Sequence, residues 1–244
     1  MKKIALIPAR YAATRFPAKL TADLCGKPVI VRTYLSTVAS GVFDEVVVVT
    51  DHQEIKSLIE KEGGKVFFSE TEHQSGSDRI AEAAKELDGD VVVNVQGDEP
   101  FQDSESLSKL VVVFEDDEVQ VASLMTGIQD VQQYNDPNAV KVVVDQKGYS
   151  MYFSRSPVPY FRNQDIQKNV YRHIGVYAYR KNALIAFTQL PKSYLEEAEM
   201  LEQLRLLEAG IKIKMVYTDH ETIAIDTPAD LGKAIEFYKS EKGH

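Results

Sequence analysis

The chain has 244 residues, of which 44% are hydrophobic and 27% are charged, as in an ordinary soluble globular protein. The net charge of −9 argues against general nucleic-acid binding, and no apolar run reaches the roughly 18 residues of a membrane helix. The single cysteine, Cys25, excludes an internal disulfide, and the N-terminus lacks the small-residue cleavage site of a signal peptide. We therefore expect a cytoplasmic protein with no membrane partner.

The first half of the chain alternates apolar runs with segments of helical period. Strands are predicted at Ile4–Pro8, Glu45–Thr50, Lys65–Phe68 and Asp90–Gln96, and helices at Pro28–Ser40, His52–Glu62 and Asp78–Leu87. Pro28 suits a first helical turn, and Gly41 suits the position after a helix. Because the runs VVVVT and VVVNV are almost entirely apolar, these strands should be covered on both faces. We predict an α/β fold with a Rossmann-like, mostly parallel sheet flanked by helices.

The second half changes character, with several strands and few helices between them. Strands are predicted at Val119–Thr126, Ala139–Asp145, Tyr149–Ser154 and Tyr171–Tyr179. They indicate a smaller mixed or antiparallel extension, at about residues 119–180, within a single domain spanning residues 1–244.

The C-terminal part returns to alternating elements. A long helix is predicted at Leu195–Glu208, ended by Gly210, followed by strands at Lys212–Tyr217 and Thr222–Ile225. Thr227, Pro228 and Asp230 then match the N-cap, first residue and third residue of a last helix.

A cationic loop follows the first predicted strand. The first 34 residues carry seven cations and one anion, and Arg10, Arg15 and Lys19 lie within residues 9–20. Ligands of open α/β sheets bind at the carboxyl ends of strands, so these three cations could surround phosphates. There is no GxGxxG motif, and Gly26-Lys27-Pro28 is not a P-loop. The charge pattern alone leaves simple surface charge as an equal alternative.

Two aspartates follow later predicted strands. Asp98 lies in NVQGDEP, where Gly97 and Pro100 turn the chain away from the sheet, and Asp226 directly precedes Thr227. A carboxylate beside phosphates needs a cation, and Mg²⁺ with one or two carboxylates is the usual arrangement. Each aspartate has a simpler reading, as a turn residue or an accessory to the helix cap. Together they predict a metal site facing the cationic loop.

Two further segments carry candidate binding residues. HQSGSDR, residues 73–79, opens a helix whose N–H groups could bind a base or ribose, although capping by Ser75 or Ser77 is the simpler interpretation. A lone His173 on a strand is more often a packed side chain. With Arg155 and Arg162 it makes an anionic second substrate plausible.

These segments together resemble the 3-deoxy-manno-octulosonate cytidylyltransferase family. The resemblance covers nearly the whole chain through IPARYAATRFPAK, CGKPVIV, HQSGSDRIAE, VVNVQGDEP, YFSRSPVPY, YRHIGVYAYR, LEEAEMLEQLRLLEAG and IDTPADL. HQSGSDRI, NVQGDEP and SRSPVPY are specific, whereas the first motif is shared by many sugar nucleotidyltransferases. The resemblance implies a fold of the nucleotide-diphospho-sugar transferase type. It also implies a homodimeric, Mg²⁺-dependent enzyme that transfers CMP from CTP to 3-deoxy-manno-octulosonate for lipopolysaccharide biosynthesis.

The same resemblance implies a role for each matching residue. The nucleotide side would comprise Arg10, Arg15, Lys19, Ser75 and Gln96, with Lys19, Arg15 and Asp98 as the catalytic group. Asp98 and Asp226 would bind Mg²⁺. The sugar would contact Gln96, Arg162, His173, Tyr177, Glu202 and Gln203.

The chain departs from the family pattern at two positions. Many members have Gly and Pro where this chain has Ala18 and Leu20, and Gly enters positive φ more cheaply than Ala. Loop closure is therefore in question. A synthetase for another sugar such as a sialic acid, a sugar with an amine at C8, and a non-catalytic nucleotide-binding regulator remain alternatives.

Overall fold

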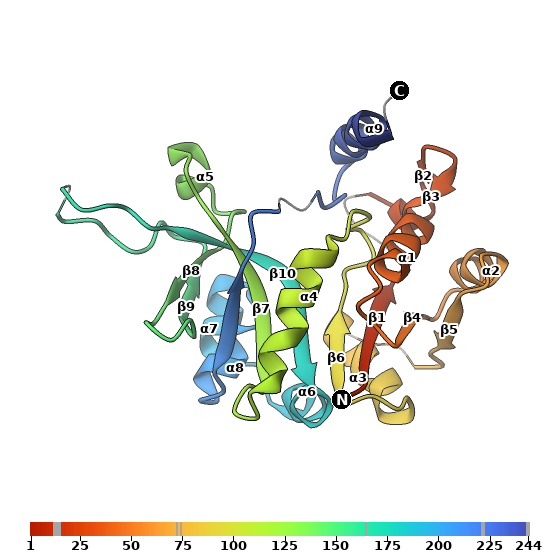
Figure 1. Cartoon of the computed structure of the whole chain (residues 1–244), viewed down its shortest axis with the longest axis horizontal. Coiled ribbons are helices and arrows are strands. Elements are labelled where there is room, and N and C mark those ends of the chain that lie inside the picture. Colours follow the sequence, from red (N-terminus) through yellow and green to blue (C-terminus); the bar gives the residue numbers. More distant parts are fainter. Residues whose placement is uncertain (12–15, 72, 74, 164, 221–222, 243–244) are drawn as a thin grey trace. The chain divides into compact units, whose positions relative to one another are not determined.

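The computed structural model describes residues 1–11, 16–71, 73, 75–163, 165–220 and 223–242. The chain divides into two compact units, which are coloured along the sequence in Figure 1. Unit 1 comprises Met1–Ser108 and Thr222–His244, and unit 2 comprises Lys109–Glu221. The expected extension at residues 119–180 falls inside unit 2. Among the described residues, no helix is both long and apolar enough to cross a bilayer.

Unit 1 is built on a parallel sheet in the order β6-β1-β4-β5. Its strands are β1 (Lys3–Ala9), β4 (Glu45–Thr50), β5 (Lys65–Phe68) and β6 (Val91–Asn94), and a small hairpin joins β2 (Asp23–Leu24) to β3 (Lys27–Pro28). The apolar runs fill the core: β6 is buried throughout, and β4 is buried beyond its first residue. This confirms the mostly parallel α/β sheet, although β6 is shorter at both ends than predicted.

The helices of unit 1 lie between strands along the chain, except the last helix, which contacts the β2–β3 hairpin. They are α1 (Val29–Ala39), α2 (Gln53–Lys61), α3 (Gly76–Glu86) and α9 (Pro228–Lys242), with a 3₁₀ turn η1 (Lys19–Thr21); α4 (Ser104–Val112) begins in unit 1 and leads into η2 (Val113–Glu115). Pro28 is the N-cap of α1 and not its first residue, so the helix begins one residue later than predicted. Gly41 has the left-handed conformation expected after a helix, at φ 66°. The predicted start of α9 is confirmed, because Asp230 N–H donates to Thr227 Oγ1 at 3.3 Å and Thr227 N–H donates to Asp230 Oδ2 at 3.1 Å.

Unit 2 contains a mixed sheet. Its strands are β7 (Val121–Gly127), β8 (Lys141–Val144), β9 (Ser150–Ser154), β10 (Tyr171–Arg180) and β11 (Ile213–Tyr217), and its helices are α5 (Val131–Asn135), α6 (Lys181–Gln189), α7 (Tyr194–Glu199) and α8 (Leu204–Glu208). β7 pairs antiparallel with β10 and parallel with β11, and β8 pairs antiparallel with β9 and β10. The mixed character of the second half is confirmed. Figure 1 shows the connection from β9 to β10 projecting beyond this sheet.

The single helix predicted at Leu195–Glu208 is wrong, because the chain leaves the helix at Met200 (φ 53°). Glu199 is held by unit 2 itself: its carboxylate accepts from Ser154 Oγ and Arg155 N–H, and its carbonyl accepts from Arg155 Nε at 2.7 Å. These bonds use the carbonyl that a continuous helix would give to its next turn. The result is two short helices, α7 and α8.

The strand predicted at Thr222–Ile225 is also wrong over its described part. Thr222 lies outside the described residues, and residues 223–225 form no strand. The apolar pattern instead marks a buried anchor, since Ile225 is 0% exposed and its N–H donates to the Asp98 carbonyl at 3.0 Å. That single backbone bond places Asp226 beside Asp98.

Candidate functional site

The exits of β1 and β6 meet at one edge of the unit 1 sheet. These strands are parallel neighbours, so their carboxyl ends lie at the same edge. Gly97 follows β6, and a Cβ at this position would lie 2.9 Å from the Pro8 carbonyl oxygen. Only glycine allows this approach without displacing the backbone. The exit of β6 is thereby held against β1, and it presents Asp98 at the edge.

Lys19 joins the two predicted metal-binding aspartates. Its ammonium Nζ forms ion pairs with Asp98 Oδ2 and with Asp226 Oδ1, the second at 3.0 Å. Burial lowers the pKa of Lys19, but the two carboxylates outweigh burial and raise its pKa above the ordinary value. Lys19 therefore remains a cation around neutral pH. The structure thus brings these three residues together, and their roles in catalysis and metal binding stay predictions.

The carboxylate pair, Asp98 and Asp226, has the donor chemistry of a magnesium site that is completed by a substrate. The described residues contain no group of three or more His, Cys, Asp or Glu side chains placed to hold a metal. Mg²⁺ commonly takes one or two protein carboxylates and fills its remaining positions with phosphate oxygens and water. Two carboxylates that already converge on one cation fit this arrangement.

Ala18 precedes Lys19 in a backbone conformation that usually requires glycine. Its φ is 56° and its ψ 23°, in the left-handed region, where it caps the 3₁₀ turn η1. An L-residue with a Cβ pays roughly 1–2 kcal/mol there. The departure from the family pattern at this position therefore stores strain next to the cation of the site.

We expect Ala18→Gly to raise the free energy of unfolding by about 1 kcal/mol, because glycine adopts this φ without steric cost. Chemical denaturation measures the change. Ala22→Gly is the matched control, since Ala22 has an extended backbone (φ −63°, ψ 142°) and should lose stability instead. A destabilised Ala18→Gly variant would contradict this account of the loop.

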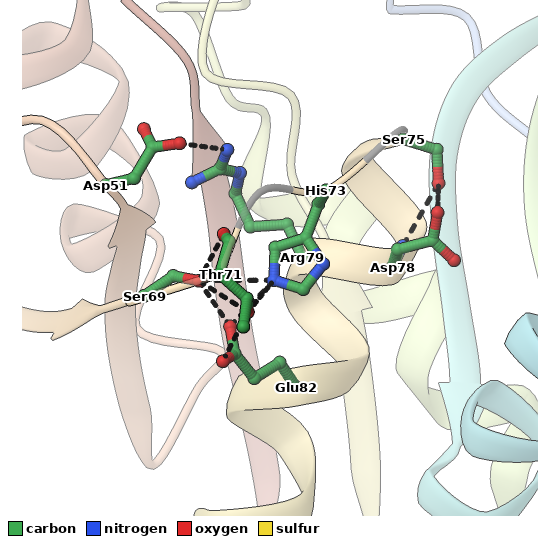
Figure 2. Close-up of polar contacts among 8 residues, drawn as sticks. All are labelled: Asp51, Ser69, Thr71, His73, Ser75, Asp78, Arg79 and Glu82. Atoms are coloured by element: carbon green, nitrogen blue, oxygen red, sulfur yellow. Dashed lines mark hydrogen bonds and ion pairs between the residues drawn. The ribbon is translucent and has the colours of Figure 1, made fainter.

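The turn before α3 is fixed by a network around Glu82 (Figure 2). The Glu82 carboxylate accepts hydrogen bonds from the Ser69 and Thr71 hydroxyls and lies 2.8 Å from His73 Nε2. Burial raises the pKa of Glu82, but these bonds, led by that from Ser69, outweigh it and lower the pKa overall. An ionised carboxylate thus ties the turn to its helix. The HQSGSDRIAE motif contains Glu82, but only the folded turn shows what it holds.

The N-terminus of α3 lies at the same sheet edge as β1. A Cβ on Gly76, the first residue of α3, would be 3.5 Å from the Pro8 ring. Ser75 caps the helix by accepting from Asp78 N–H at 3.1 Å, which bears out the simpler interpretation of this serine. Below it, buried Arg79 forms an ion pair with Asp51 at 2.6 Å. The helix end is therefore rigidly placed, and its nucleotide role stays a prediction.

The remaining predicted nucleotide residues are only partly placed. Arg10 is exposed directly after β1, and Gln96 is half-buried after β6, each at the carboxyl end of its strand. Arg15 lies outside the described residues. Arg10 and Gln96 thus lie just beyond the carboxyl ends of the neighbouring strands β1 and β6, whereas Lys19 begins η1.

The predicted sugar residues of unit 2 form a second cluster, which we call the unit 2 cluster: His173, Tyr177, Glu202 and Gln203. The rings of His173 and Tyr177 lie 5.2 Å apart on β10. Glu202 lies near enough to Tyr177 that its charge contributes, after burial and Tyr179, to raising the pKa of the Tyr177 hydroxyl. The phenol therefore stays neutral and can donate a hydrogen bond.

Two buried polar atoms of the unit 2 cluster lack protein partners. The Tyr177 hydroxyl and Gln203 Nε2 have no hydrogen-bond partner among the described residues. Buried polar groups are almost always paired, so such atoms indicate a ligand or ordered water. Arg162 is exposed on the connection from β9 to β10, and no contact among the described residues joins it to the cluster. Its sugar role stays a prediction.

His173 is held as a neutral imidazole. Its Nε2 lies 2.9 Å from Ser123 Oγ, and its ring packs edge-on against Phe153 at 5.1 Å. Burial, with a smaller contribution from Arg172, lowers the pKa of His173 from 6.5 to about 3. His173 is thus a packed, neutral histidine whose ring lies 5.2 Å from that of Tyr177, and its sugar role stays a prediction.

The free energy of unfolding should therefore fall as the pH falls from 7 to 5. The unfolded chain protonates His173 below pH 6.5 and the folded protein does not until about pH 3, so acid favours unfolding. At about 1.4 kcal/mol per pK unit, the loss by pH 5 is about 2 kcal/mol. Denaturant titrations of the wild type and His173→Gln measure it as the difference between their pH slopes. Ser123→Ala, which keeps the imidazole, should retain the wild-type slope, and equal slopes in the wild type and His173→Gln would contradict the assignment.

Comparison with known proteins identifies the family of the chain. Residues 4–213 match the Cytidylyltransferase family. The chain is 54% identical to the 3-deoxy-manno-octulosonate cytidylyltransferase of Flavobacterium johnsoniae, covering 96% of this chain and 97% of that one. It is 52% identical to the protein of the same name from Christiangramia forsetii, covering 95% and 94%. The chain belongs to the 3-deoxy-manno-octulosonate cytidylyltransferase family.

Solved structures agree with this membership. The structure of CMP:2-keto-3-deoxy-manno-octonic acid synthetase complexed with CTP matches with a TM-score of 0.94 and 37% identity, over 99% of this chain and 100% of that one. A 4-diphosphocytidyl-2C-methyl-D-erythritol synthase from Anaerococcus prevotii matches at a TM-score of 0.66 and 19% identity, over 98% of each chain, which shows a shared fold.

Proposed function

We propose that the protein transfers CMP from CTP to 3-deoxy-D-manno-octulosonate and releases pyrophosphate. The observation that carries the proposal is Lys19 lying between Asp98 and Asp226 at the carboxyl edge of the unit 1 sheet. A cation and two acids at such an edge suit a triphosphate and its metal, and the relatives that match the whole chain bear this enzyme's name. The same features support membership of the nucleotidyltransferases rather than a non-catalytic regulator.

The proposed reaction is an in-line displacement. The anomeric hydroxyl oxygen of the sugar bonds to the α-phosphorus, the bond from that phosphorus to the β-phosphate oxygen breaks, and the hydroxyl proton passes to solvent. No covalent intermediate with the protein is needed. The demands on the protein are alignment of the two substrates and compensation of the charge that builds up on the leaving pyrophosphate.

The residues of unit 1 supply charge and position. Lys19 and Arg15 would offset the negative charge of the leaving group, and Arg10, Gln96 and the α3 N-terminus at Ser75 would hold the nucleotide. Mg²⁺ held by Asp98 would neutralise triphosphate charge, and Mg²⁺ held by Asp98 and Asp226 together with substrate oxygens would acidify the sugar hydroxyl. When Lys19 turns toward the phosphates, the carboxylate pair becomes available to that ion.

The residues of unit 2 would hold the sugar acid. The neutral Tyr177 hydroxyl and the Gln203 amide can donate to sugar oxygens, and Glu202 can accept from sugar hydroxyls. His173, kept neutral by burial, lies beside Tyr177 in the same cluster. Arg162 is proposed to contact the carboxylate of the sugar.

We further propose that the enzyme is a cytoplasmic homodimer that supplies lipopolysaccharide biosynthesis. The sequence motifs support this assignment through the family resemblance, and a single cysteine suits a reducing compartment. Gel filtration coupled to light scattering measures the oligomeric state, and a mass of one chain would reject the dimer.

The test of the proposed function is pyrophosphate release with matched substrates. CTP with 3-deoxy-D-manno-octulosonate should give the highest kcat/KM, and UTP, ATP, a sialic acid or the 8-amino sugar should give lower values. A pocket built for a substrate's amino group leaves polar atoms unpaired with an analogue that lacks it. Equal kcat/KM for all nucleotides, or a clear preference for another sugar acid, would reject the assignment.

Substitution of Asp98 and of Asp226 should affect CTP binding and the chemical step differently. We expect Asp98→Asn to weaken Mg²⁺–CTP binding and to lower turnover roughly 10²-fold or more, because it removes a charge next to the triphosphate. Asp226→Asn should bind Mg²⁺–CTP almost normally and lose the chemical step. Calorimetry measures the CTP affinity and single-turnover assays measure the chemical step.

Asp230→Asn serves as the control, because Asp230 belongs to the Thr227 cap and should cost about 1 kcal/mol of stability only. An Asp226→Asn variant with a lower melting temperature but an unchanged single-turnover rate would reduce Asp226 to a supporting residue of that cap.

A further inference from the structure

A glycine interrupts the middle of β10, where a side chain would normally stabilise the strand. Gly175 lies in the sequence YRHIGVYAYR, in which Ile174, Val176 and Ala178 are buried. Gly175 lies midway in the sequence between His173 and Tyr177, two residues of the unit 2 cluster. Glycine inside a strand loses backbone entropy and offers no packing, so its presence there requires a reason.

Neither backbone conformation nor crowding supplies that reason. Gly175 is not among the glycines with positive φ, so an L-residue could adopt its conformation. A Cβ at this position would meet no heavy atom of the described residues outside its two neighbours within 4 Å. Gly64, Gly89 and Gly97 differ, because a Cβ on each would lie under 3.0 Å from another residue. The space in front of Gly175 is open.

A bulge in β10 brings two aromatic rings of the unit 2 cluster close together. The register between β10 and β7 shifts between Ile174 and Tyr177, which forms a bulge at Gly175. In a regular strand residues four apart are separated by about 13 Å. Here the rings of His173 and Tyr177 lie 5.2 Å apart. The bulge that contains Gly175 therefore brings the two rings together, and residue 175 itself adds no side chain there.

Two polar atoms of the same cluster lack the hydrogen bonds that buried polar atoms normally make. The buried Tyr177 hydroxyl has no hydrogen-bond partner among the described residues, and neither has Gln203 Nε2 on the segment after Glu202. Open space in front of a glycine, in a cluster with two aromatic rings and two unpaired buried donors, fits a compact polyhydroxylated molecule. Such a molecule has C–H faces that approach a backbone closely and hydroxyls that accept from the donors.

We propose that Gly175 determines the sugar specificity of the protein, because the sugar acid occupies the space that any side chain at position 175 would fill. A C–H face of the sugar ring lies against the Cα of Gly175, bordered by the rings of His173 and Tyr177. This inference rests on the proposed function, since it assigns the sugar substrate to the unit 2 cluster. It adds a steric selection to the hydrogen bonds that the cluster offers.

The test compares Gly175→Ala and Gly175→Val with the wild type. A methyl group that displaces the sugar should raise the KM for 3-deoxy-D-manno-octulosonate about 10-fold or more, and the valine side chain should raise it further. The Kd for CTP, measured by calorimetry without sugar, should stay within about twofold. The melting temperature of Gly175→Ala should stay level or rise, because alanine reduces the entropy of the unfolded chain without a clash.

Gly232→Ala is the matched control. Gly232, in α9 of unit 1, also has no positive φ, and its Cβ would likewise meet nothing described within 4 Å. It should gain stability while both substrate constants remain those of the wild type. A structural role for Gly175 would instead lower the melting temperature and disturb CTP and sugar together.

The outcomes separate this inference from the proposed function. If the wild type and Gly232→Ala turn over the sugar and Gly175→Ala has the same sugar KM, the inference is wrong and the proposed function stands. A Gly175→Ala variant that melts earlier and weakens both substrates equally also overturns the inference. If the wild type turns over no sugar acid, the proposed function fails and the inference falls with it.

Discussion

Two carboxylates approach each other at low cost only when a cation lies between them, and in this protein that cation is the ammonium of Lys19. The arrangement links three distant parts of the sequence. Lys19 follows the loop after β1, Asp98 follows β6, and Asp226 is brought there by the bond from Ile225 N–H to the Asp98 carbonyl. A magnesium ion carrying a triphosphate presents to these carboxylates a charge of the same sign as Lys19. Lys19 offsets one of the two negative charges, and we propose that divalent ions take its place at the carboxylates when the substrates bind.

Other features of unit 1 serve to hold this arrangement. Gly97 lets the exit of β6 touch the Pro8 carbonyl, which no residue with a Cβ could do without a shift. Ala18 accepts a left-handed backbone so that the chain can turn into η1 at Lys19. Glu82 fixes the turn before α3 by accepting from Ser69 and Thr71. The strained backbone of Ala18, beside Lys19, thus lowers the stability of the fold, and packing and hydrogen bonds nearby offset this cost.

Much of unit 1 could be predicted because its signals are local. The apolar run at Glu45–Thr50 and the cap at Thr227 each define their element without help from the rest of the chain. The features that were missed depend on distant contacts. The helix break at Met200 follows from hydrogen bonds between Glu199 and Arg155. The apolar pattern around Ile225 resembles that of a strand, but Ile225 is buried and bonds through its N–H to the Asp98 carbonyl. The hydrogen-bond network at Glu82 involves Ser69, Thr71 and His73, which only the folded turn brings together. Gly175 did carry a sequence signal, a glycine inside an alternating strand, but its meaning required knowledge of the space around it.

The central claim is that Asp98 and Asp226 exchange Lys19 for divalent ions as the substrates bind, beginning with Asp98 when the nucleotide binds. A crystal structure with CTP and Mn²⁺, read from the anomalous scattering of manganese, tests it most directly. We expect a manganese peak in contact with Asp98, with the Lys19 ammonium moved from the two carboxylates onto a phosphate oxygen. Manganese bound elsewhere, with Lys19 still bridging Asp98 and Asp226 in the presence of CTP, would contradict it.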